Sequence, residues 1–523
     1  MRLPSIPAIA AVLLALGCGP GDVTTDAGTV CEPSCRSGYV CLHGECVSAC
    51  NPVCDVGERC TDEGECVPGA LDAGSMDGGT DPLDAGSLDD AGASAEDAGW
   101  PGDAGASGDA GPMDGSAGDA GMTADAGPPA SCPEGEVLCG GSCVAPVLPD
   151  VGARTPTSGR YNDDWFEAAG DIAVDPCTGN MGIAYSRQIS GGANWEIYVV
   201  VVPAAAGASA TTPVRVTTAP GKADSVAVAW AGDRFGVFWS EPRHDPAPET
   251  CGSSCLQELY YAAFDPMTGA IVVPEVRLTT HASSYRAGST RAVWSPEAGE
   301  IGVAWTDSRT SRQVHAAIVD PDGRIRAEQV VSAATSPQRG NTPRIVWNDG
   351  AWHVLYRHDD PDGGRPDYLH TRRLDVTGTL GPDVDLRVPA EQIGLTARGD
   401  SGYATLTSGG SPLALRLWSL DWTATTTLPL SIGTYDGSRE LVWDGSSLYA
   451  TDTGLTLQIV RYNALGTETG RIALTSDTRM RSASGLRMHR IGSRLVIMWL
   501  WSTGGLSPTV HHQVHVVDTS SAM

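Results

Sequence analysis

From about residue 152 to the end of the chain, apolar and polar residues alternate with a period of two. The segment 301–307, for example, reads Ile-Gly-Val-Ala-Trp-Thr-Asp, and clusters of Asp, Gly, Asn and Pro separate such segments. Alternation of this kind, rich in branched and aromatic residues, is typical of half-buried β-strands. We therefore expect an all-β domain over 152–523.

A hairpin of two short apolar strands recurs about every 50 residues in this region. The clearest copies end their two strands in Trp230 and Trp239, in Trp294 and Trp305, and in Trp347 and Tyr356. Weaker copies lie near 171–185, 440–449 and 486–499, and a third and often a fourth strand follow each hairpin. Four antiparallel strands per repeat, repeated six or seven times, predict a β-propeller.

The repeats start near 168, 225, 290, 342, 395, 434 and 483, but the fifth is poorly defined, so six or seven blades are expected. The last copy stops after about three strands. The segment from Arg160 to Phe166 is the candidate for the missing strand that closes the ring. A pair of β-sandwiches is the alternative, although it would not explain the repeat.

Aromatic side chains close the second strand of several repeats, and we expect them to pack between blades. They are Trp239, Trp305, Tyr356 and Trp499.

Residues 71–131 have a different composition, with eight Asp-Ala-Gly triplets, 13 acidic residues and neither Lys nor Arg. Small residues with one sign of charge cannot form a core, so we expect a disordered, extended tether. Calcium binding is an alternative, but the spacing is not that of an EF-hand. The tether supplies much of the chain's net charge of −29. So acidic a chain makes nucleic acid an unexpected partner.

The chain begins with Arg2 and an apolar run that ends Ala-Leu-Gly before Cys18. This pattern resembles the bacterial lipobox, and the resemblance implies that 1–17 is a signal peptide and that Cys18 carries lipid. A plain secretory signal is the alternative. Gly19 in place of Asp implies the outer membrane, on the periplasmic side or the cell surface. The lipid would be the membrane anchor, with 18–30 leading away from it.

Fourteen of the 15 cysteines remain if Cys18 is lipidated, and an exported protein favours disulfides. Two groups with nearly equal spacing lie in 31–70: Cys31, Cys35, Cys41 and Cys46, then Cys50, Cys54, Cys60 and Cys66. They resemble small EGF-like modules of bacterial surface proteins, and zinc binding is the alternative. We also expect one of Cys132, Cys139 and Cys143, in a small knot over 132–151, to bond Cys177. Cys251 and Cys255 should pair locally.

Loops that enter the innermost strands and loops that join second to third strands share one face of a propeller. Eight residues are therefore candidate ligand-binding residues: Glu241, Arg243, Arg291, Asp307, Arg309, Arg344, His358 and Asp359. Arg291 and Arg344 each stand three residues before a tryptophan, so they could face the axis together and bind a carboxylate or sulfate. Structural Asp–Arg pairing between adjacent blades is the competing interpretation, and catalysis is a third.

Few other motifs carry chemistry. On a strand, His511 and His515 would lie about 13 Å apart, so we reject one metal ion shared by His511, His512 and His515. We predict no metal or cofactor. No nucleophile-elbow, zinc-protease or P-loop motif is present in the sequence.

The repeats resemble the propellers of bacterial surface lipoproteins and are distantly similar to sialidase-type and WD40-like folds. The sialidase Asp-box is absent from the sequence, which argues against glycosidase activity. Two functions remain. One is a surface-displayed module that binds or adheres to an extracellular glycan or protein. The other is a hydrolase or lyase acting on extracellular polysaccharide through carboxylates such as Glu241, Asp307 and Asp359.

Overall fold

The computed structural model describes residues 132–520, apart from position 134 and a set of loops, together with four short strands nearer the N-terminus. The loops left out are 161–169, 190–193, 249–254, 281–287, 309–311, 333–338, 360–366, 390–391, 409–412, 431–439, 454–455, 475–485 and 503–508. Each of them joins an outermost strand to the next innermost strand, or a second strand to a third.

Seven four-stranded antiparallel sheets form the domain, and in six of them the strands follow chain order from the innermost strand outward. Blade 1 has β8 (Asp171–Val174), β9 (Met181–Gln188), β10 (Trp195–Val202) and β11 (Val214–Arg215), and blade 2 has β12 (Asp224–Trp230), β13 (Phe235–Glu241), β14 (Glu258–Phe264) and β15 (Ile271–Arg277). Blade 3 has β16 (Gly288–Ser295), β17 (Glu300–Asp307), β18 (Gln313–Val319) and β19 (Ile325–Val330), and blade 4 has β20 (Arg339–Asn348), β21 (Ala351–Asp359), β22 (Tyr368–Asp375) and β23 (Val384–Pro389).

Blade 5, which the sequence defines poorly, is a regular sheet. It has β24 (Gln392–Ala397), a 3-10 turn η2 (Gly399–Ser401), β25 (Tyr403–Ser408), β26 (Ala414–Trp418) and β27 (Ala424–Pro429). Blade 6 has β28 (Leu441–Trp443), β29 (Ser447–Thr453), β30 (Leu457–Asn463) and β31 (Glu468–Ala473). The protein is therefore a seven-bladed all-β propeller, which confirms the predicted fold class and settles the blade count.

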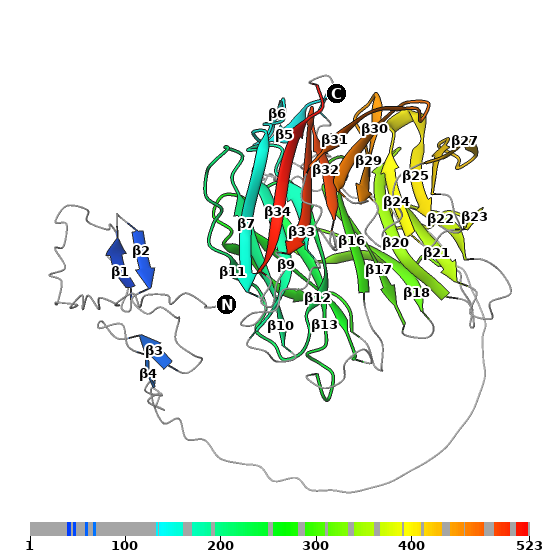
Figure 1. The fold of residues 1–523 in the computed structure, drawn as a ribbon. Coiled ribbons are helices and arrows are strands. Elements are labelled where there is room, and N and C mark those ends of the chain that lie inside the picture. Colours follow the sequence, from blue (N-terminus) through cyan, green and yellow to red (C-terminus); the bar gives the residue numbers. More distant parts are fainter. Residues whose placement is uncertain are drawn as a thin grey trace, which may run out of the picture. The chain divides into compact units, whose positions relative to one another are not determined.

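The seventh blade closes the ring with strands from both ends of the domain. It contains β32 (Arg487–Ile491), β33 (Arg494–Ser502), β34 (Thr509–Asp518) and, outermost, β7 (Gly152–Arg160). Figure 1 shows β7, in cyan, beside β34, in red, and Val510 pairs with Gly159 in the antiparallel register. The closing strand thus precedes the first repeat as expected, but it ends at Arg160, where the predicted segment was to begin.

Aromatic side chains pack between neighbouring blades, as predicted. Trp239, Trp305, Tyr356 and Trp499 are at most 2% exposed. Trp239 belongs to one cluster with Ile197 of blade 1, and Trp305 to one with Phe238 of blade 2. Burying one such side chain stabilises the fold by about 1.5–3 kcal/mol, so these contacts hold the ring of blades together.

A small knot precedes the propeller, with the hairpin β5 (Val137–Cys139) and β6 (Ser142–Val144). Two disulfides hold it, Cys132–Cys143 and Cys139–Cys177. The second one confirms the predicted clamp onto the turn between β8 and β9. Main-chain hydrogen bonds add to it, since Val147 N–H donates to the carbonyl of Pro176 at 2.9 Å. Cys255 is also disulfide-bonded, but its predicted partner lies outside the described residues.

The N-terminal 116 residues form a separate unit. Within it, β1 (Tyr39–Leu42) pairs with β2 (Glu45–Ser48), and β3 (Glu58–Cys60) pairs with β4 (Cys66–Pro68). Each of the two cysteine-rich repeats thus forms a short hairpin at the corresponding position. The predicted signal peptide, Cys18 and the Asp-Ala-Gly tether lie outside the described residues. Among the described residues, the structure has no helix that is long and apolar enough to cross a membrane.

Candidate functional site

Two of the predicted carboxylates hydrogen-bond the aromatic residue two positions before them. Trp239 Nε1–H donates to Glu241 at 3.0 Å, and Trp305 Nε1–H donates to Asp307 at 3.4 Å. Residues i and i+2 of a strand share one face, so this pairing follows from strand geometry. Glu241 is 1% exposed and Asp307 is fully buried. Both carboxylates are therefore part of the blade packing.

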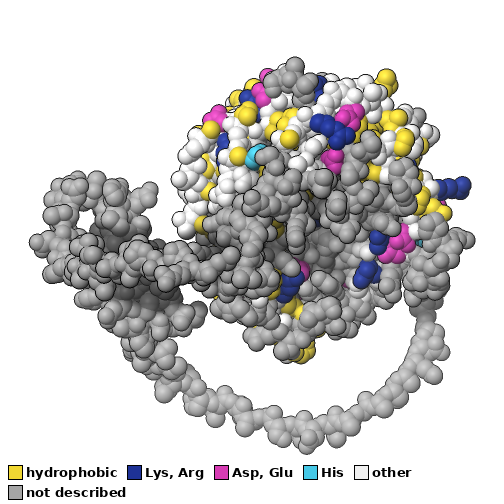
Figure 2. Space-filling view, viewed as in Figure 1, with side chains coloured by type: hydrophobic (Ala, Val, Ile, Leu, Met, Phe, Trp, Pro, Cys, Tyr) yellow, Lys and Arg dark blue, Asp and Glu magenta, His cyan; other side chains and the backbone are white. Residues whose placement is uncertain are grey.

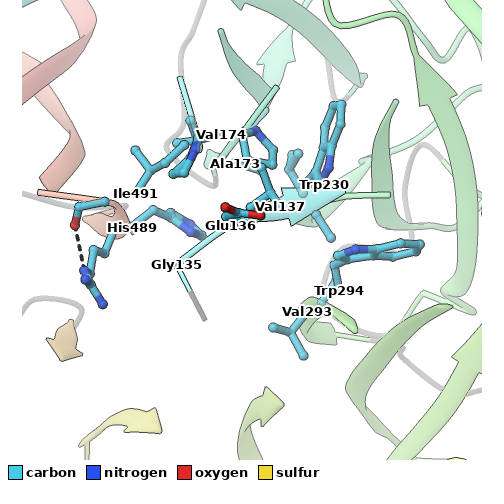
Figure 3. A pocket seen from close by; sticks show the side chains of 17 residues that line it. Gly135, Glu136, Val137, Ala173, Val174, Trp230, Val293, Trp294, His489 and Ile491 are labelled. Atoms are coloured by element: carbon cyan, nitrogen blue, oxygen red, sulfur yellow. Dashed lines mark hydrogen bonds between the residues drawn. The ribbon is translucent and has the colours of Figure 1, made fainter. Parts of the chain in front are cut away.

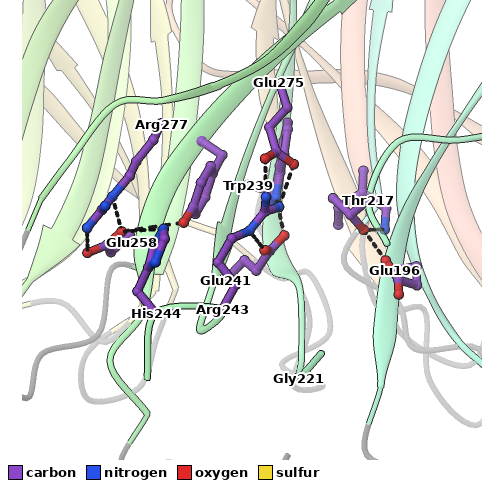
Figure 4. A network of polar contacts seen from close by, with 12 residues as sticks. Glu196, Thr217, Gly221, Trp239, Glu241, Arg243, His244, Glu258, Glu275 and Arg277 are labelled. Carbon is purple, nitrogen blue, oxygen red and sulfur yellow. Dashed lines mark hydrogen bonds and ion pairs between the residues drawn. The ribbon is translucent and has the colours of Figure 1, made fainter. Parts of the chain in front are cut away.

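Arg243 completes a polar network across blade 2, drawn in Figure 4. Its guanidinium donates to Glu241 and to Glu275 on the outermost strand β15, and it lies 4.5 Å from the ring centre of Tyr260. Burial alone would lower the pKa of Arg243, but the bonds to both carboxylates raise it above its ordinary value. This network extends towards the outer edge of the blade and away from the axis.

The candidates in blade 4 also bond near neighbours. Asp359 pairs with Arg357 and accepts a hydrogen bond from Asn341 at 3.4 Å. His358 Nδ1 lies 3.4 Å from His370 Nε2, and burial followed by the charge of His370 lowers the pKa of His358. Arg309 lies outside the described residues.

Charged side chains from different blades meet around the propeller axis. In each of five blades, the second strand carries an interblade aromatic residue. The residue just before that aromatic pairs with one residue of the innermost strand, which we call the ring position. In chain order these residues are Asp171, Ala227, Arg291, Arg344 and Arg487. In blade 5 the corresponding residue is Gly394, and in blade 6 it is Glu440, whose carbonyl accepts from Thr451 N–H. We call the charged members, Asp171, Arg291, Arg344, Glu440 and Arg487, the axial ring.

Arg487 neutralises both carboxylates of the axial ring. Its Nε lies 2.9 Å from Asp171 Oδ1, and its Nη1 lies 3.7 Å from Glu440 Oε1. The three side chains are only 9%, 7% and 18% exposed, respectively. Asp171 also accepts hydrogen bonds from the main-chain N–H groups of Val228 and Ile172, both at 3.0 Å. One side of the ring is thus a compact buried ion-pair cluster.

Arg291 and Arg344, from adjacent blades 3 and 4, form the other side of the ring. Arg291 donates to the carbonyl of Thr290 at 2.8 Å, and Arg344 donates to the carbonyl of Ile393 at 3.0 Å. Among the described residues neither guanidinium has a carboxylate partner within ion-pair distance. Burial, then the neighbouring Arg487 and Arg344, lower the pKa of Arg291 well below its ordinary value. Three cations against two anions leave this side of the ring with uncompensated positive charge.

A cavity of about 430 Å³ lies next to the axial ring, further along the innermost strands. Ala173, Ala229, Val293 and His489 line it, and each stands two residues after a ring position of blades 1, 2, 3 and 7. Residues two apart share a strand face, so the cavity continues the same inner surface. Figure 3 shows Trp230, Trp294 and the knot residue Glu136 around it.

Only two of the five axial-ring residues were predicted from the sequence. Arg291 and Arg344 were predicted to face the axis together, and they occupy equivalent positions on the innermost strands of adjacent blades, where Arg344 lowers the pKa of Arg291. Asp171, Glu440 and Arg487 were not predicted, because each stands at or just before the start of its strand, where the repeat is weakest. Aligning the second strands on their aromatic residues would have found Asp171 and Arg487.

The described residues contain no cluster of three potential metal ligands. His512 is fully buried with its ring 4.9 Å from that of Tyr185, and His515 lies 4.9 Å from Trp499, centre to centre. On the face drawn in Figure 2, the described basic and acidic side chains are interspersed among apolar ones. The described side chains of that face form no broad patch of one sign, whereas the axial ring holds three arginines and two carboxylates.

The fold and the axial ring define the class of protein as a closed seven-bladed β-propeller with a polar axis. No family model matches the chain, and no curated protein matches its sequence. Among solved structures, polysaccharide lyase Uly1 is similar, with a TM-score of 0.41 and 9% identity over 67% of this chain and 89% of that one.

Two further solved structures are similar at this level. A neuraminidase-like protein of A/flat-faced bat/Peru/033/2010 has a TM-score of 0.39 and 11% identity over 72% of this chain and 98% of that one. The α-L-arabinanase of Penicillium chrysogenum has a TM-score of 0.35 and 12% identity over 70% of this chain and 100% of that one. These likenesses concern the fold alone.

Proposed function

We propose that this protein is an extracellular binding protein, held at the outer membrane by lipid on Cys18, whose propeller binds an anionic ligand at the axial ring. In this proposal, the cysteine-rich repeats of 31–70 and the acidic tether of 71–131 keep the propeller at a distance from the membrane surface. One observation carries the binding proposal. Arg291 and Arg344 occupy equivalent positions on the innermost strands of adjacent blades and influence each other electrostatically, while Arg487 lies within ion-pair distance of both ring carboxylates.

The physical argument concerns the cost of unpaired buried charge. Burial has cost the two guanidiniums part of their hydration, and Arg344 lowers the pKa of Arg291, while Glu440 favours the charged form of both without forming an ion pair with either among the described residues. An oxyanion between them would remove both penalties and accept paired N–H donors from each planar guanidinium. The arrangement therefore favours a bound carboxylate, sulfate or phosphate over an empty site.

The alternative, a hydrolase or lyase, has less support in the geometry. Two-carboxylate glycosidase chemistry needs an acid and a base on opposite sides of the scissile bond. Glu241 and Asp359 are paired with Arg243 and Arg357, and Asp307 is fully buried beside an indole. In the axial ring, Asp171 and Glu440 share one arginine, which leaves neither available as a free base.

A binding screen tests the proposed function. The full chain, purified in detergent, is applied to an array of acidic and neutral oligosaccharides at two salt concentrations. We expect retention on acidic members only, weaker at high salt and weaker still for the double variant R291Q/R344Q. If R291Q/R344Q were retained as strongly as the wild-type protein, the axial site would be refuted. If a polymeric substrate gave shortened products, the enzyme alternative would be favoured.

A further inference from the structure

A second cavity, of about 770 Å³, lies between the knot and the turns of blades 2 and 3. It adjoins the cavity beside the axial ring, because Glu136 of the knot and the indoles of Trp230 and Trp294 line both. Its other walls include the turns that join β12 to β13, β16 to β17 and β18 to β19. We call this space the knot cleft. It has the volume of a small-molecule site.

The charged side chains of the knot cleft are mostly acidic. Five carboxylates and one guanidinium line it, from Glu136, Asp233, Glu297, Asp320, Asp322 and Arg234. Arg234 pairs with Asp233 at 2.7 Å and with Asp322 at 3.2 Å. Asp320 accepts main-chain N–H groups of its own turn, and Glu297 accepts the indole N–H of Trp347. Only the carboxylate of Glu136 lacks such a partner among the described residues of the cleft.

The fold holds both indoles of the knot cleft in place. Trp230 packs edge-on against Phe235, with 5.3 Å between the ring centres. Trp294 lies against the β12–β13 turn, where a Cβ atom on Gly232 would come within 3.3 Å of its ring. Both indoles are half-buried, and Figure 3 shows the side chain of Glu136 extending from the knot into the space that they border. A ligand in this space would therefore meet aromatic faces that need no further ordering.

A tryptophan at the same strand position in blade 6 shows which group such an indole accepts in this protein. Trp443 stands three residues beyond Glu440, as Trp230 and Trp294 stand three residues beyond their own ring positions. The guanidinium of Arg398 lies 4.9 Å from the ring centre of Trp443. Among the described residues, no cation lies over the ring of Trp230 or Trp294. In the knot cleft a carboxylate takes the place of that arginine, so a cation from outside would complete the arrangement.

We infer that the knot cleft binds an alkylguanidinium group, which stacks on the indoles of Trp230 and Trp294 and pairs with the carboxylate of Glu136. A planar guanidinium suits both contacts, because it stacks on aromatic faces and donates two parallel hydrogen bonds to a carboxylate. Val137 and Pro296 add apolar surface for the alkyl chain. Arginine side chains and small free guanidines share this chemistry. Neither Arg291 nor Arg344 lines the cleft, so this site is independent of the proposed anion site.

The experiment titrates the full chain, purified in detergent, with matched probes and follows the indole N–H resonances by NMR. Propylguanidinium and propylurea have nearly the same shape but differ in charge, and propylammonium carries the charge without the planar group. We expect propylguanidinium to bind roughly tenfold more tightly than propylurea, the effect of one carboxylate pair with aromatic support. It should also bind more tightly than propylammonium. The resonances of Trp230 and Trp294, assigned from W230F and W294F, should shift at the same probe concentrations.

Three variants test the contacts, and the melting temperature of each checks that it is folded. Glu136→Gln should remove most of the tenfold preference for propylguanidinium and leave propylurea binding unchanged, because the exposed amide keeps the shape of the side chain. Trp294→Leu should weaken the binding of propylguanidinium. Trp443→Leu is the matched control, because this indole has the same strand position but lines neither cavity. It should leave propylguanidinium binding as in the wild-type protein.

Several results would overturn the inference. Equal affinities for propylurea and propylguanidinium would show that the cleft takes an apolar group, and an unchanged affinity in E136Q would place the probe elsewhere on this acidic chain. Tighter binding of propylammonium would show that the planar group is not recognised.

The amide of Nα-acetylarginine distinguishes the two sources of the guanidinium. Tighter binding than that of propylguanidinium would identify an arginine of a peptide or protein as the ligand. Weaker binding would identify a small free guanidine, and either result supports the site.

Discussion

Two arginines at equivalent ring positions should respond in opposite ways to the same substitution. Arg487 bridges two carboxylates, and Arg291 faces another arginine. We predict that Arg487→Gln destabilises the unliganded protein and that Arg291→Gln stabilises it. Loss of a buried arginine normally destabilises a fold, so a gain at Arg291 would be diagnostic of uncompensated charge.

The magnitudes follow from the contacts. Removing Arg487, at 2.9 and 3.7 Å from its partners, leaves two mostly buried carboxylates without a counter-ion. Breaking such a buried cluster costs about 3–5 kcal/mol of unfolding free energy. Strands β16 and β20, which carry Arg291 and Arg344, are in contact. Two like charges at a separation of about 8 Å and an effective dielectric of about 20 repel by about 2 kcal/mol, which sets the scale of the expected gain.

Urea denaturation followed by circular dichroism, in low-salt buffer without multivalent anions, measures both effects. Arg326→Gln is the matched control, because its pair with Glu300 lies at the surface and should be worth at most about 1 kcal/mol. If Arg291→Gln destabilised the protein as much as Arg487→Gln, Arg291 would have a carboxylate partner. The charge argument for an anion site would then be refuted.

Three further predictions concern other parts of the chain. Burial lowers the pKa of His512 to about 3 and that of His353 to about 4. Below pH 6.5 only the unfolded chain takes up these protons, so the stability of the fold should decrease from pH 6.5 to 4. His512→Met should flatten a plot of melting temperature against pH, and an unchanged slope would contradict the assignment. Replacing Cys139 and Cys177 by Ser should lower the unfolding free energy by about 4 kcal/mol on the chain-entropy model and make the knot sensitive to protease, whereas wild-type resistance would show that the clamp is dispensable. Cys18→Ser should move the protein from the membrane fraction to the soluble fraction, and continued membrane association would refute the lipid anchor.

The sequence predicts the propeller because its pattern is local. Strand alternation and turn residues recur in each repeat, and several repeats also carry an interblade aromatic residue such as Trp239 or Trp305. The blades can therefore be recognised from local sequence alone. The clamp to Cys177 was predictable from an odd number of cysteines in the knot. The closing strand was placed too late, because the partner of β34 is set by register across the whole domain.

The candidate site was only partly predictable, for a related reason. The pattern of an aromatic residue followed two positions later by a carboxylate is conspicuous at Glu241 and Asp307, yet it describes packing within one blade. Arg291 and Arg344 were found because both precede a tryptophan by three residues. Their significance depends on Asp171, Glu440 and Arg487, which come from other blades and share no local motif.

The most direct test of the central claim is a crystal structure of the full chain grown with selenate, whose anomalous scattering locates the anion. Our account predicts a selenate peak within hydrogen-bond distance of both Arg291 and Arg344, and its loss in R291Q/R344Q. A protein carboxylate paired with these two arginines, or selenate bound only at surface arginines, would contradict it.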